Sequence, residues 1–571
     1  MDTSTFKPRI TGFSSRVRAL YKSLSPERVL MLWCFFALAI VLLFTALVVF
    51  NQRFLIAVPT YGGSIKEGIV GTPRFINPVL ATSDQDKDLT ALIYAGLTKK
   101  DALGHPVNDM AESIIESEDR LHYNVIIKSD AEFQNGSPVT SDDIIYTIGL
   151  IQDPSMKSPH RIEWEGVTIE KQGDRELTFS LKQPYPQFMD ALSIGILPKA
   201  IWKNLTIEQI SLSDYNIHAI GSGPYRIKSI TTNSGIPETL TLESFKYYTL
   251  GRPYIDKLTI IVYQNEKTLI QGFQNGDIDR LYGIAPEKIS QLNVAASNIH
   301  TSLLPRTFEV FFNPNKASTL SDKQVRAALQ MAINKKAIVD TVLQNYGKAI
   351  DSPYPFDEEP AISEYDVAKA RTLLVTSRSF KNSSSTLSIT LATANTDEMK
   401  KVAEMIKADW NAIGVHTTLA IYEVPDLNQT VIKDRDFQAL LFGSITEDPS
   451  DLYAFWHSSQ RTYPGLNISN YVSKRLDSNL ETLRSTSDEV ERAQAYNDLK
   501  KEFREEVPGI FLFAPSLIYV TRDQAFTALP SYSSDSSSRF NLIEEWHRYV
   551  DHVWPKAYYK PLTEFLENIL H

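Results

Sequence analysis

The segment LSITLATANTDEMKKVAEMIKADWNAIGVHTTLAIY, residues 387–422, decides the fold of this chain. Its first seven residues alternate between apolar and polar side chains, which is typical of a half-buried strand. A helix pattern follows, in which the apolar residues recur on one face: Met399, Val402, Ile406, Trp410 and Ile413. Gly414 ends this helix, and a second alternating segment begins after it. Because a right-handed crossover joins such strands in parallel, the sequence predicts an α/β fold.

A third strand is predicted at FQALLFGS, which begins at Phe437. In open α/β sheets, ligands bind beyond the carboxyl ends of the strands, often beside a helix N-terminus. This rule selects a set of candidate ligand contacts at the ends of two strands: Thr393, Asn395, Thr396, Phe442, Gly443 and Ser444. The acidic run ITEDPSD continues from the third strand, and Glu447 and Asp448 in it either contact the ligand or belong to a solvated loop.

The sequence also predicts where the lobes begin and end. The segment SDKQVRAALQMAIN has a helical apolar face with Ser321 as its cap, and TFEVFFN before it alternates as a strand. Composition changes there, so we expect a first lobe over 51–306 and a second lobe over 307–515. PGIFLFAPSLIYV is expected to form a buried strand pair broken by Pro515. Residues 516–571 should return to the first lobe, with FNLIEEWHRYV as a strand and the last twenty residues as a helix.

Two loops in the first lobe are predicted from proline and glycine. In TPRFINP, Pro73 and Pro78 exclude a helix or a central strand, so Phe75 and Asn77 are expected in an exposed loop. IGSGPYRI begins like a dinucleotide-binding loop, but Arg226 occupies the third glycine position. We therefore expect a turn in which Gly221 and Gly223 supply positive φ angles.

The apolar run VLMLWCFFALAIVLLFTALVVF, residues 29–50, contains 22 residues and no charge. At about 1.5 Å per residue it can cross a hydrocarbon layer roughly 30 Å thick, so we expect a transmembrane anchor. Residues 1–28 contain six basic side chains against Asp2 and Glu27, which predicts a cytoplasmic N-terminus. A cleaved signal peptide is the alternative, although VVFNQRFL offers no small-residue cleavage site.

Composition excludes several classes of function for the part outside the membrane. The first 50 residues hold six of the 58 Lys and Arg residues and two of the 68 Asp and Glu residues, so the remainder carries a net charge of −14. This argues against nucleic acid as a partner. The single cysteine, Cys34, lies in the anchor, so no disulfide or catalytic thiolate is expected outside. No HExxH or GxSxG motif occurs, and we predict no catalytic residues, no metal and no cofactor.

Several segments, taken together and in order, resemble the extracytoplasmic solute-binding proteins of peptide and nickel ABC importers, the oligopeptide- and dipeptide-binding family 5. They cover roughly residues 63–550: GTPRFINP, AEFQNGSPVTSDDIIYTI, IGSGPYRI, FKYYTLGRPYIDKL, VFFN followed by VRAALQMAIN, and DWNAIGV. The resemblance implies a two-lobed periplasmic-binding-protein-like fold of type II with an accessory subdomain. It also implies that the chain crosses between the lobes near TFEVFFN and returns near LFAPSLIY.

The resemblance implies a function as well. A peptide-like ligand would lie between the lobes, and the closed form would dock on an ABC permease driven by ATPase subunits. The candidate ligand-binding set is completed by Phe75, Asn77, Asn313, Glu447 and Asp448. One departure concerns the aspartate that anchors the peptide amine in this family, because Ile445 occupies its position. A sensor or chaperone module without transport remains an alternative, and an anchored extracellular hydrolase is a weaker one.

Overall fold

The computed structural model describes residues 25–185, 187–357, 364–381, 387–486, 488–522, 525, 527–531 and 533–553, without the side chains of 52–54. The chain forms two compact units, one made of residues up to Thr60 and from Tyr549 onward, the other of Tyr61–Arg548. Most of the predicted basic tail and the predicted C-terminal helix lie outside the described residues.

The smaller unit contains the helix α2 (Pro26–Phe54), with Pro26 at its first turn, where a proline costs no hydrogen bond. Its stretch Pro26–Asn51 is long and apolar enough to cross a membrane. The strand β1 (Ile56–Thr60) pairs antiparallel with β20 (Tyr549–Val553). The strand predicted over 540–550 is therefore wrong for its first part. The 3-10 helix η9 (Ser536–Phe540) ends at its first residue, and the 3-10 helix η10 (Ile543–Glu545) lies within it.

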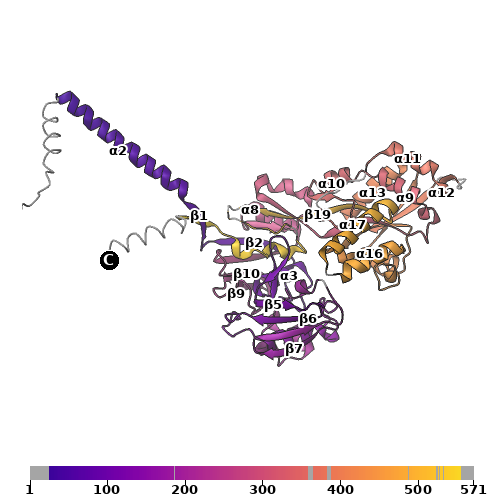
Figure 1. Ribbon diagram of the computed structural model, residues 1–571, viewed down its shortest axis with the longest axis horizontal. Coiled ribbons are helices and arrows are strands. Elements are labelled where there is room, and N and C mark those ends of the chain that lie inside the picture. The colour runs from indigo at the N-terminus through magenta and orange to yellow at the C-terminus, as the bar shows by residue number, and fades with distance from the viewer. Residues whose placement is uncertain are drawn as a thin grey trace, which may run out of the picture. The chain divides into compact units, whose positions relative to one another are not determined.

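One mixed sheet runs through the larger unit (Figure 1). Its strands lie in this order: β17 (His416–Tyr422), β16 (Ser388–Ala394), β18 (Ala439–Ile445), β14 (Arg306–Phe312), β19 (Gly509–Thr521), β12 (Arg280–Tyr282), β2 (Ser64–Val70), β11 (Lys257–Tyr263), β10 (Ile236–Ser244) and β9 (Tyr225–Asn233). Two short strands, β13 (Ile299–Leu303) and β15 (Gly347–Ala349), also pair with β19.

The predicted strand–helix–strand unit is confirmed. β16 pairs in parallel with β17 and with β18, and α13 (Asp397–Ala412) connects the first two strands. The apolar helix face is buried as expected, with Val402 and Trp410 at 0% exposure. The helix α9 (Lys323–Ala332) is also confirmed, but its cap is Asp322, because Ser321 belongs to a preceding 3-10 turn.

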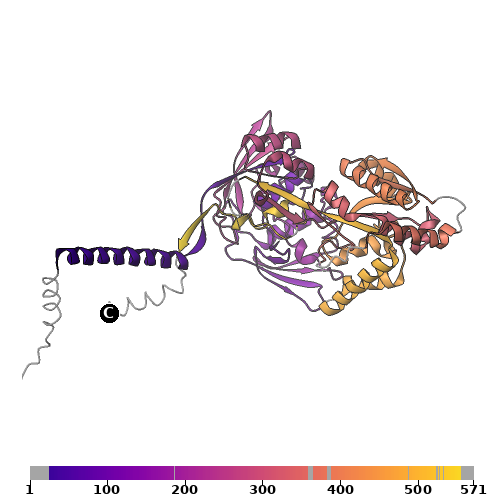
Figure 2. The ribbon, with the colours of Figure 1, turned by 90° about the horizontal axis from the view of Figure 1, so that it is seen from above.

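The predicted strand pair broken by Pro515 is wrong, because β19 is one continuous strand of 13 residues (Figure 2). β19 changes partners at this proline: residues before it pair with β14, and residues after it pair with β13 and β12. A proline is tolerated where the hydrogen-bond ladder passes from one partner strand to another. β14 and β19 thus link the two halves of the sheet.

The larger unit has two main hydrophobic cores. One is built from residues between Ile65 and Ile260 with late residues such as Tyr519 and Trp546, and the other from residues between Val310 and Ala514. A separate antiparallel sheet belongs to the first core: β5 (Ala111–Glu116), β6 (His122–Ile127), β8 (Glu176–Ser180) and β7 (Thr168–Gly173). We propose that the two cores are the two lobes, with boundaries after 306 and 515, and that this separate sheet is the accessory subdomain.

Candidate functional site

A cavity of about 510 Å³ opens within the larger unit. Most of its wall comes from the first lobe, including the helix α3 (Asp84–Ile93), the short helix α5 (Phe188–Ala191) and η9. The second lobe contributes Ile445, Glu447 and Asp451, which follow β18. The cavity is therefore shared by two lobes whose hydrophobic cores are separate.

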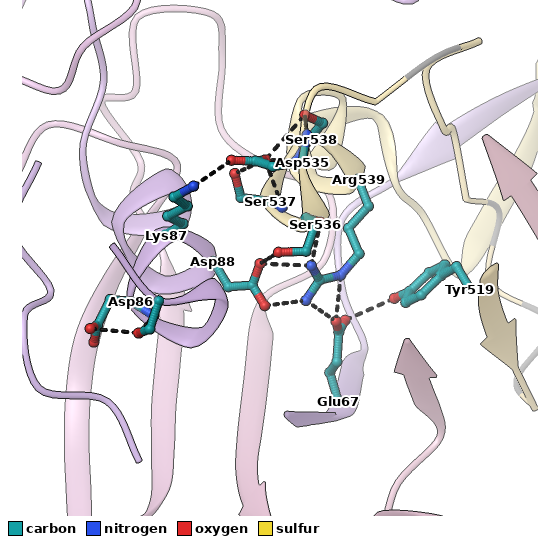
Figure 3. Close-up of polar contacts among 11 residues, drawn as sticks. Glu67, Asp86, Lys87, Asp88, Tyr519, Asp535, Ser536, Ser537, Ser538 and Arg539 are labelled. Atoms are coloured by element: carbon teal, nitrogen blue, oxygen red, sulfur yellow. Dashed lines mark hydrogen bonds and ion pairs between the residues drawn. The ribbon is translucent and has the colours of Figure 1, made fainter. Parts of the chain in front are cut away.

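Arg539 joins α3 and η9, two elements that line this cavity, to β2 and β19 (Figure 3). Its guanidinium is fully buried and donates to both carboxylate oxygens of Asp88 on α3 at 2.8 Å. The same group donates to Glu67 Oε1 on β2, with Nε at 2.8 Å and Nη2 at 2.7 Å. The Tyr519 hydroxyl donates to the other oxygen of Glu67 at 2.8 Å. One cation thus connects β2, α3, β19 and η9.

The charges in this cluster depend on one another. Burial lowers the pKa of Arg539, but the carboxylates of Asp88 and Glu67 outweigh it and hold that pKa well above its usual value. Burial raises the pKa of Asp88, and Arg539 opposes the rise. The guanidinium carbon of Arg539 also lies 3.7 Å from the centre of the Tyr282 ring. The cluster fixes α3 beside η9, where Lys87 and Asp535 form an ion pair of 3.7 Å at the cavity.

Tyr94 follows α3 and is positioned by close backbone packing. A Cβ at Gly221 would lie 2.2 Å from the Ile93 carbonyl oxygen, and the Gly223 N–H donates to that oxygen at 2.8 Å. The prediction that these glycines supply positive φ angles is wrong, because neither is among the positive-φ residues of the described chain. They are glycines because two chain segments approach too closely for a side chain. Tyr94 lines the cavity and is 4% exposed.

Two sets of polar contacts bridge the lobes beside the cavity. Lys100, at the end of β3 (Thr98–Lys100), donates to Glu447 Oε2 at 2.8 Å, and the Ser534 hydroxyl donates to the same oxygen at 2.9 Å. Gln187 donates to Asp451 Oδ1 at 3.1 Å.

Asp451 shapes the loop that carries Glu447. Its Oδ2 accepts the backbone N–H groups of Glu447 and Asp448, both at 2.9 Å. Burial raises the pKa of Asp451 to about 6 despite these hydrogen bonds. The second lobe therefore presents Glu447 to the first lobe from a loop braced by a buried carboxyl group.

Of the residues predicted in the acidic loop and on β18 to contact the ligand, Glu447 alone lines the cavity. Asp448 caps the following 3-10 helix Pro449–Asp451 and contacts Arg492. Ser444 donates to the buried Glu309 at 2.8 Å, Gly443 packs against the ring of Phe308, and Phe442 packs against the second core.

The predicted residues on or directly after β16 and β14 lie away from the cavity wall formed by the described residues. Thr393 is buried and donates to the Leu441 carbonyl at 3.2 Å, whereas Asn395 is exposed and donates to Glu423 at 2.6 Å. Thr396 caps α13, and Asn313 is buried and donates to the Arg435 carbonyl at 2.8 Å. The sheet order explains this for Thr393, Asn395 and Thr396, because β16 lies outside β18. Asn313 follows β14, which runs antiparallel to β18, so it lies at the opposite end of the sheet from the loop after β18.

The structure corrects the prediction that the loop around Asn77 is exposed. Asn77 is fully buried rather than exposed: its Nδ2 donates to Asn216 Oδ1 at 3.0 Å, and its Oδ1 accepts the Val79 N–H at 2.9 Å. Phe75 is partly buried, and its N–H donates to Asp86 at 3.0 Å. The two prolines do exclude regular structure, but the asparagine supplies the hydrogen bonds that let this loop be buried.

Sequence reasoning missed most of the cavity wall. Lys100, Tyr185, Gln187 and Asp190 line it, yet they belong to no motif and lie in short elements or connections. Among the described residues, no group of three or more His, Cys, Asp or Glu side chains could hold a metal ion. The wall offers carboxylates, ammonium groups and aromatic rings, which suit an organic ligand with polar groups.

Comparisons with known proteins agree with this geometry. The family model of bacterial extracellular solute-binding proteins, family 5, middle part, matches residues 105–464. The oligopeptide-binding protein AppA of Bacillus subtilis (strain 168) is 28% identical over 480 residues, which cover 80% of this chain and 87% of that protein.

Solved structures are similar as well. The ABC transporter substrate-binding protein CtaP of Listeria monocytogenes has a TM-score of 0.72 at 25% identity, covering 86% of this chain and 100% of that one. AppA of Bacillus subtilis in complex with a nonapeptide has a TM-score of 0.63 at 26% identity, with the same coverage. These similarities confirm the predicted two-lobed periplasmic-binding-protein-like fold.

Proposed function

The chain belongs to family 5 of the bacterial extracellular solute-binding proteins, and from this premise we propose that it captures short peptides in the cavity between its lobes and delivers them to the permease of an ABC importer. The observation that carries the proposal is the cavity itself, whose wall includes residues of both lobes. A ligand that touches both walls stabilises the closed arrangement over the open one. The similarity to an oligopeptide-binding protein supports a peptide as the ligand.

The proposed ligand contacts follow from the cavity wall. Glu447 is retained from the sequence-based set, and we add Tyr185, Gln187 and Asp190 from the first lobe. Phe442, Ser444 and Asn395 stay predictions for a longer ligand that extends along the end of the sheet. A volume of about 510 Å³ falls in the range of about 300–1,000 Å³ common for small-ligand sites, which favours a short peptide.

We expect short peptides to raise the melting temperature of the purified full-length chain in detergent. A peptide at one hundred times its Kd stabilises the folded state by about 2.7 kcal/mol, because it binds the folded state only. The measurement is a thermal-shift screen with a pool of two- to five-residue peptides, using a nickel–histidine chelate and an oligosaccharide pool as controls. A shift with either control and none with peptides would contradict the proposed ligand class.

We propose that α2 anchors the chain in the membrane with the N-terminus in the cytoplasm and the lobes outside. The support is the apolar stretch Pro26–Asn51 together with the basic excess that precedes it in the sequence. An alkaline phosphatase fused to the C-terminus should be active in cells, and a green fluorescent protein at the same position should be dark. The reverse pattern would refute this topology. N-terminal sequencing of the membrane-bound protein separates an intact anchor from a cleaved signal peptide.

A further inference from the structure

One side of the cavity carries more negative charge than the protein itself neutralises. We call it the acidic wall and define it by four cavity residues: Glu163, Asp190, Glu447 and Asp451. One of them has a cationic partner, since Glu447 pairs with Lys100 at 2.8 Å, and Glu163 contacts the imidazole of His160 at 3.3 Å. Asp451 accepts only uncharged N–H groups among the contacts described above. Asp190 Oδ1 is buried without a hydrogen-bond partner among the described residues.

Tyr185 lines the same cavity as these carboxylates. It lies in the connection between β8 and α5, two residues before Gln187. Burial raises the pKa of its hydroxyl, and four carboxylates raise it further: Glu163, Asp451, Asp190 and Glu447. An aromatic ring in a cavity whose carboxylates outnumber their cationic partners is a favourable environment for an organic cation.

The position of Asp190 adds a second electrostatic argument. Burial raises the pKa of Asp190; Lys100 opposes this rise, and Glu447 and Asp448 of the second lobe add to it. The charges of Glu447 and Asp448 therefore act on Asp190 across the lobe boundary, and Lys100 offsets them in part. A further positive charge placed beside Asp190 would reduce the remaining repulsion and favour closure.

Two hydroxyl groups at the cavity are available to bind a ligand or a water molecule. Tyr94 is 4% exposed, and its hydroxyl has no hydrogen-bond partner among the described residues. The same holds for the hydroxyl of Thr90, one helical turn before it. Both residues line the cavity. Buried polar atoms are normally satisfied, so these two are expected to gain partners when the cavity is occupied.

Resting on the proposed function, we propose that the captured peptide carries a positive charge and that this charge binds at the acidic wall, between the Asp190 carboxylate and the ring of Tyr185. The charge is an ammonium or guanidinium group, supplied by the peptide N-terminus or by a lysine or arginine side chain. This location differs from position 445, where the exposed side chain of Ile445 cannot pair with a cation. Asp190, which belongs to the first lobe, thus gives the site its preference for a charged peptide.

The test measures peptide binding to the full-length chain in detergent by calorimetry. The probes are tetra-alanine, its N-acetylated form, and an N-acetylated tetrapeptide in which lysine replaces the second alanine. A casein digest, before and after acetylation of its amines, serves as a broader pool analysed by mass spectrometry. We expect at least one of the two charged probes to bind about tenfold or more tightly than acetylated tetra-alanine. The charged probe that binds identifies the source of the charge.

Variants separate a charge-selecting role from a structural one. Asp190→Asn should reduce the preference for the charged probe, measured as the ratio of its affinity to that of acetylated tetra-alanine, to roughly threefold or less. Tyr185→Leu should also weaken the preference, whereas Tyr185→Phe should retain it. Asp174→Asn is the matched control, because that side chain is 86% exposed and does not line the cavity. Melting temperatures without peptide establish that each variant is folded.

The possible outcomes distinguish failure of this inference from failure of the proposed function. Equal binding of charged and acetylated peptides by the unaltered chain overturns the inference while leaving peptide capture intact. A loss of all peptide binding in folded Asp190→Asn, acetylated tetra-alanine included, also overturns it, because the residue would then support the cavity as a whole. If no probe and no peptide of either pool binds, peptide capture itself is refuted, and this inference falls with it.

Discussion

Replacing Arg539 with methionine is expected to lower the free energy of unfolding by about 3–5 kcal/mol. The guanidinium is fully buried and is the ion-pair partner of two buried carboxylates, Glu67 and Asp88. Arg539→Met leaves these two carboxylates in the interior without a counter-charge, and the penalty for an unpaired buried charge is large. Urea unfolding of the full-length chain in detergent, followed by tryptophan fluorescence, measures the change.

A control and a partial rescue make this prediction specific. Lys87→Met removes the cation of the half-exposed Lys87–Asp535 pair on the same helix, so it should cost less than about 1 kcal/mol. Adding Asp88→Asn to Arg539→Met should recover part of the lost stability, because it removes one of the two unpaired charges. If Arg539→Met costs no more than Lys87→Met, the buried cluster does not hold α3, β2 and η9 together in the way we describe.

The same substitution should also disturb the cavity. Lys87 and Asp535 lie at the cavity on the two elements that Arg539 joins, so loss of this link should weaken peptide binding even in the protein that remains folded. Binding to the folded fraction, measured well below the melting temperature, is the appropriate readout.

Local pattern was sufficient to predict part of the fold. The strand–helix–strand unit at residues 387–422 was recoverable because apolar spacing, a helix-ending glycine and the handedness of crossovers are properties of a short segment. The same is true of α9, whose apolar face was predicted from the spacing within residues 321–334. Such features need no knowledge of distant parts of the chain.

The predictions that were wrong concern residues whose structural partners lie far away in the sequence. Pro515 was expected to break a strand, but β19 passes through it because its neighbours change there. Gly221 and Gly223 were predicted to supply positive φ angles in a turn. They are glycines instead because the backbone of Ile93 leaves no room for a side chain. Neither effect can be read from a local window, because both arise only when distant segments pack together.

Only one part of the candidate site, the loop after β18, could be predicted from the sequence. The rule for strand ends led to the loop after β18, and Glu447 in that loop does line the cavity. Its partner Lys100 lies 347 positions earlier, and the acidic wall combines residues from both lobes. Sequence spacing could not bring these residues together, since the arrangement of the lobes decides which strand ends face the cavity.

Glu309→Gln is expected to stabilise the chain, and increasingly so as the pH rises. Glu309 is fully buried on β14, where Ser444 donates to its Oε1 at 2.8 Å and its Oε2 has no hydrogen-bond partner among the described residues. Burial raises the pKa of this carboxyl group from 4.5 to about 8, so it stays protonated in the folded state at neutral pH. The unfolded chain instead releases this proton near pH 4.5, so the unfolded state gains stability relative to the folded state up to about pH 8.

Glutamine has nearly the same shape and no proton to lose, so the variant should escape this pH dependence. Its advantage over the unaltered chain should grow by on the order of 3 kcal/mol between about pH 5 and pH 7. Urea unfolding at these two pH values measures the difference, and Glu404→Gln is the control because its side chain is 61% exposed. An advantage of the same size at both pH values would mean that Glu309 ionises normally in the folded state. In that case a cation or water must reach the carboxylate on β14, a strand that links the lobes, and the packing around this strand would have to be looser than the structure shows.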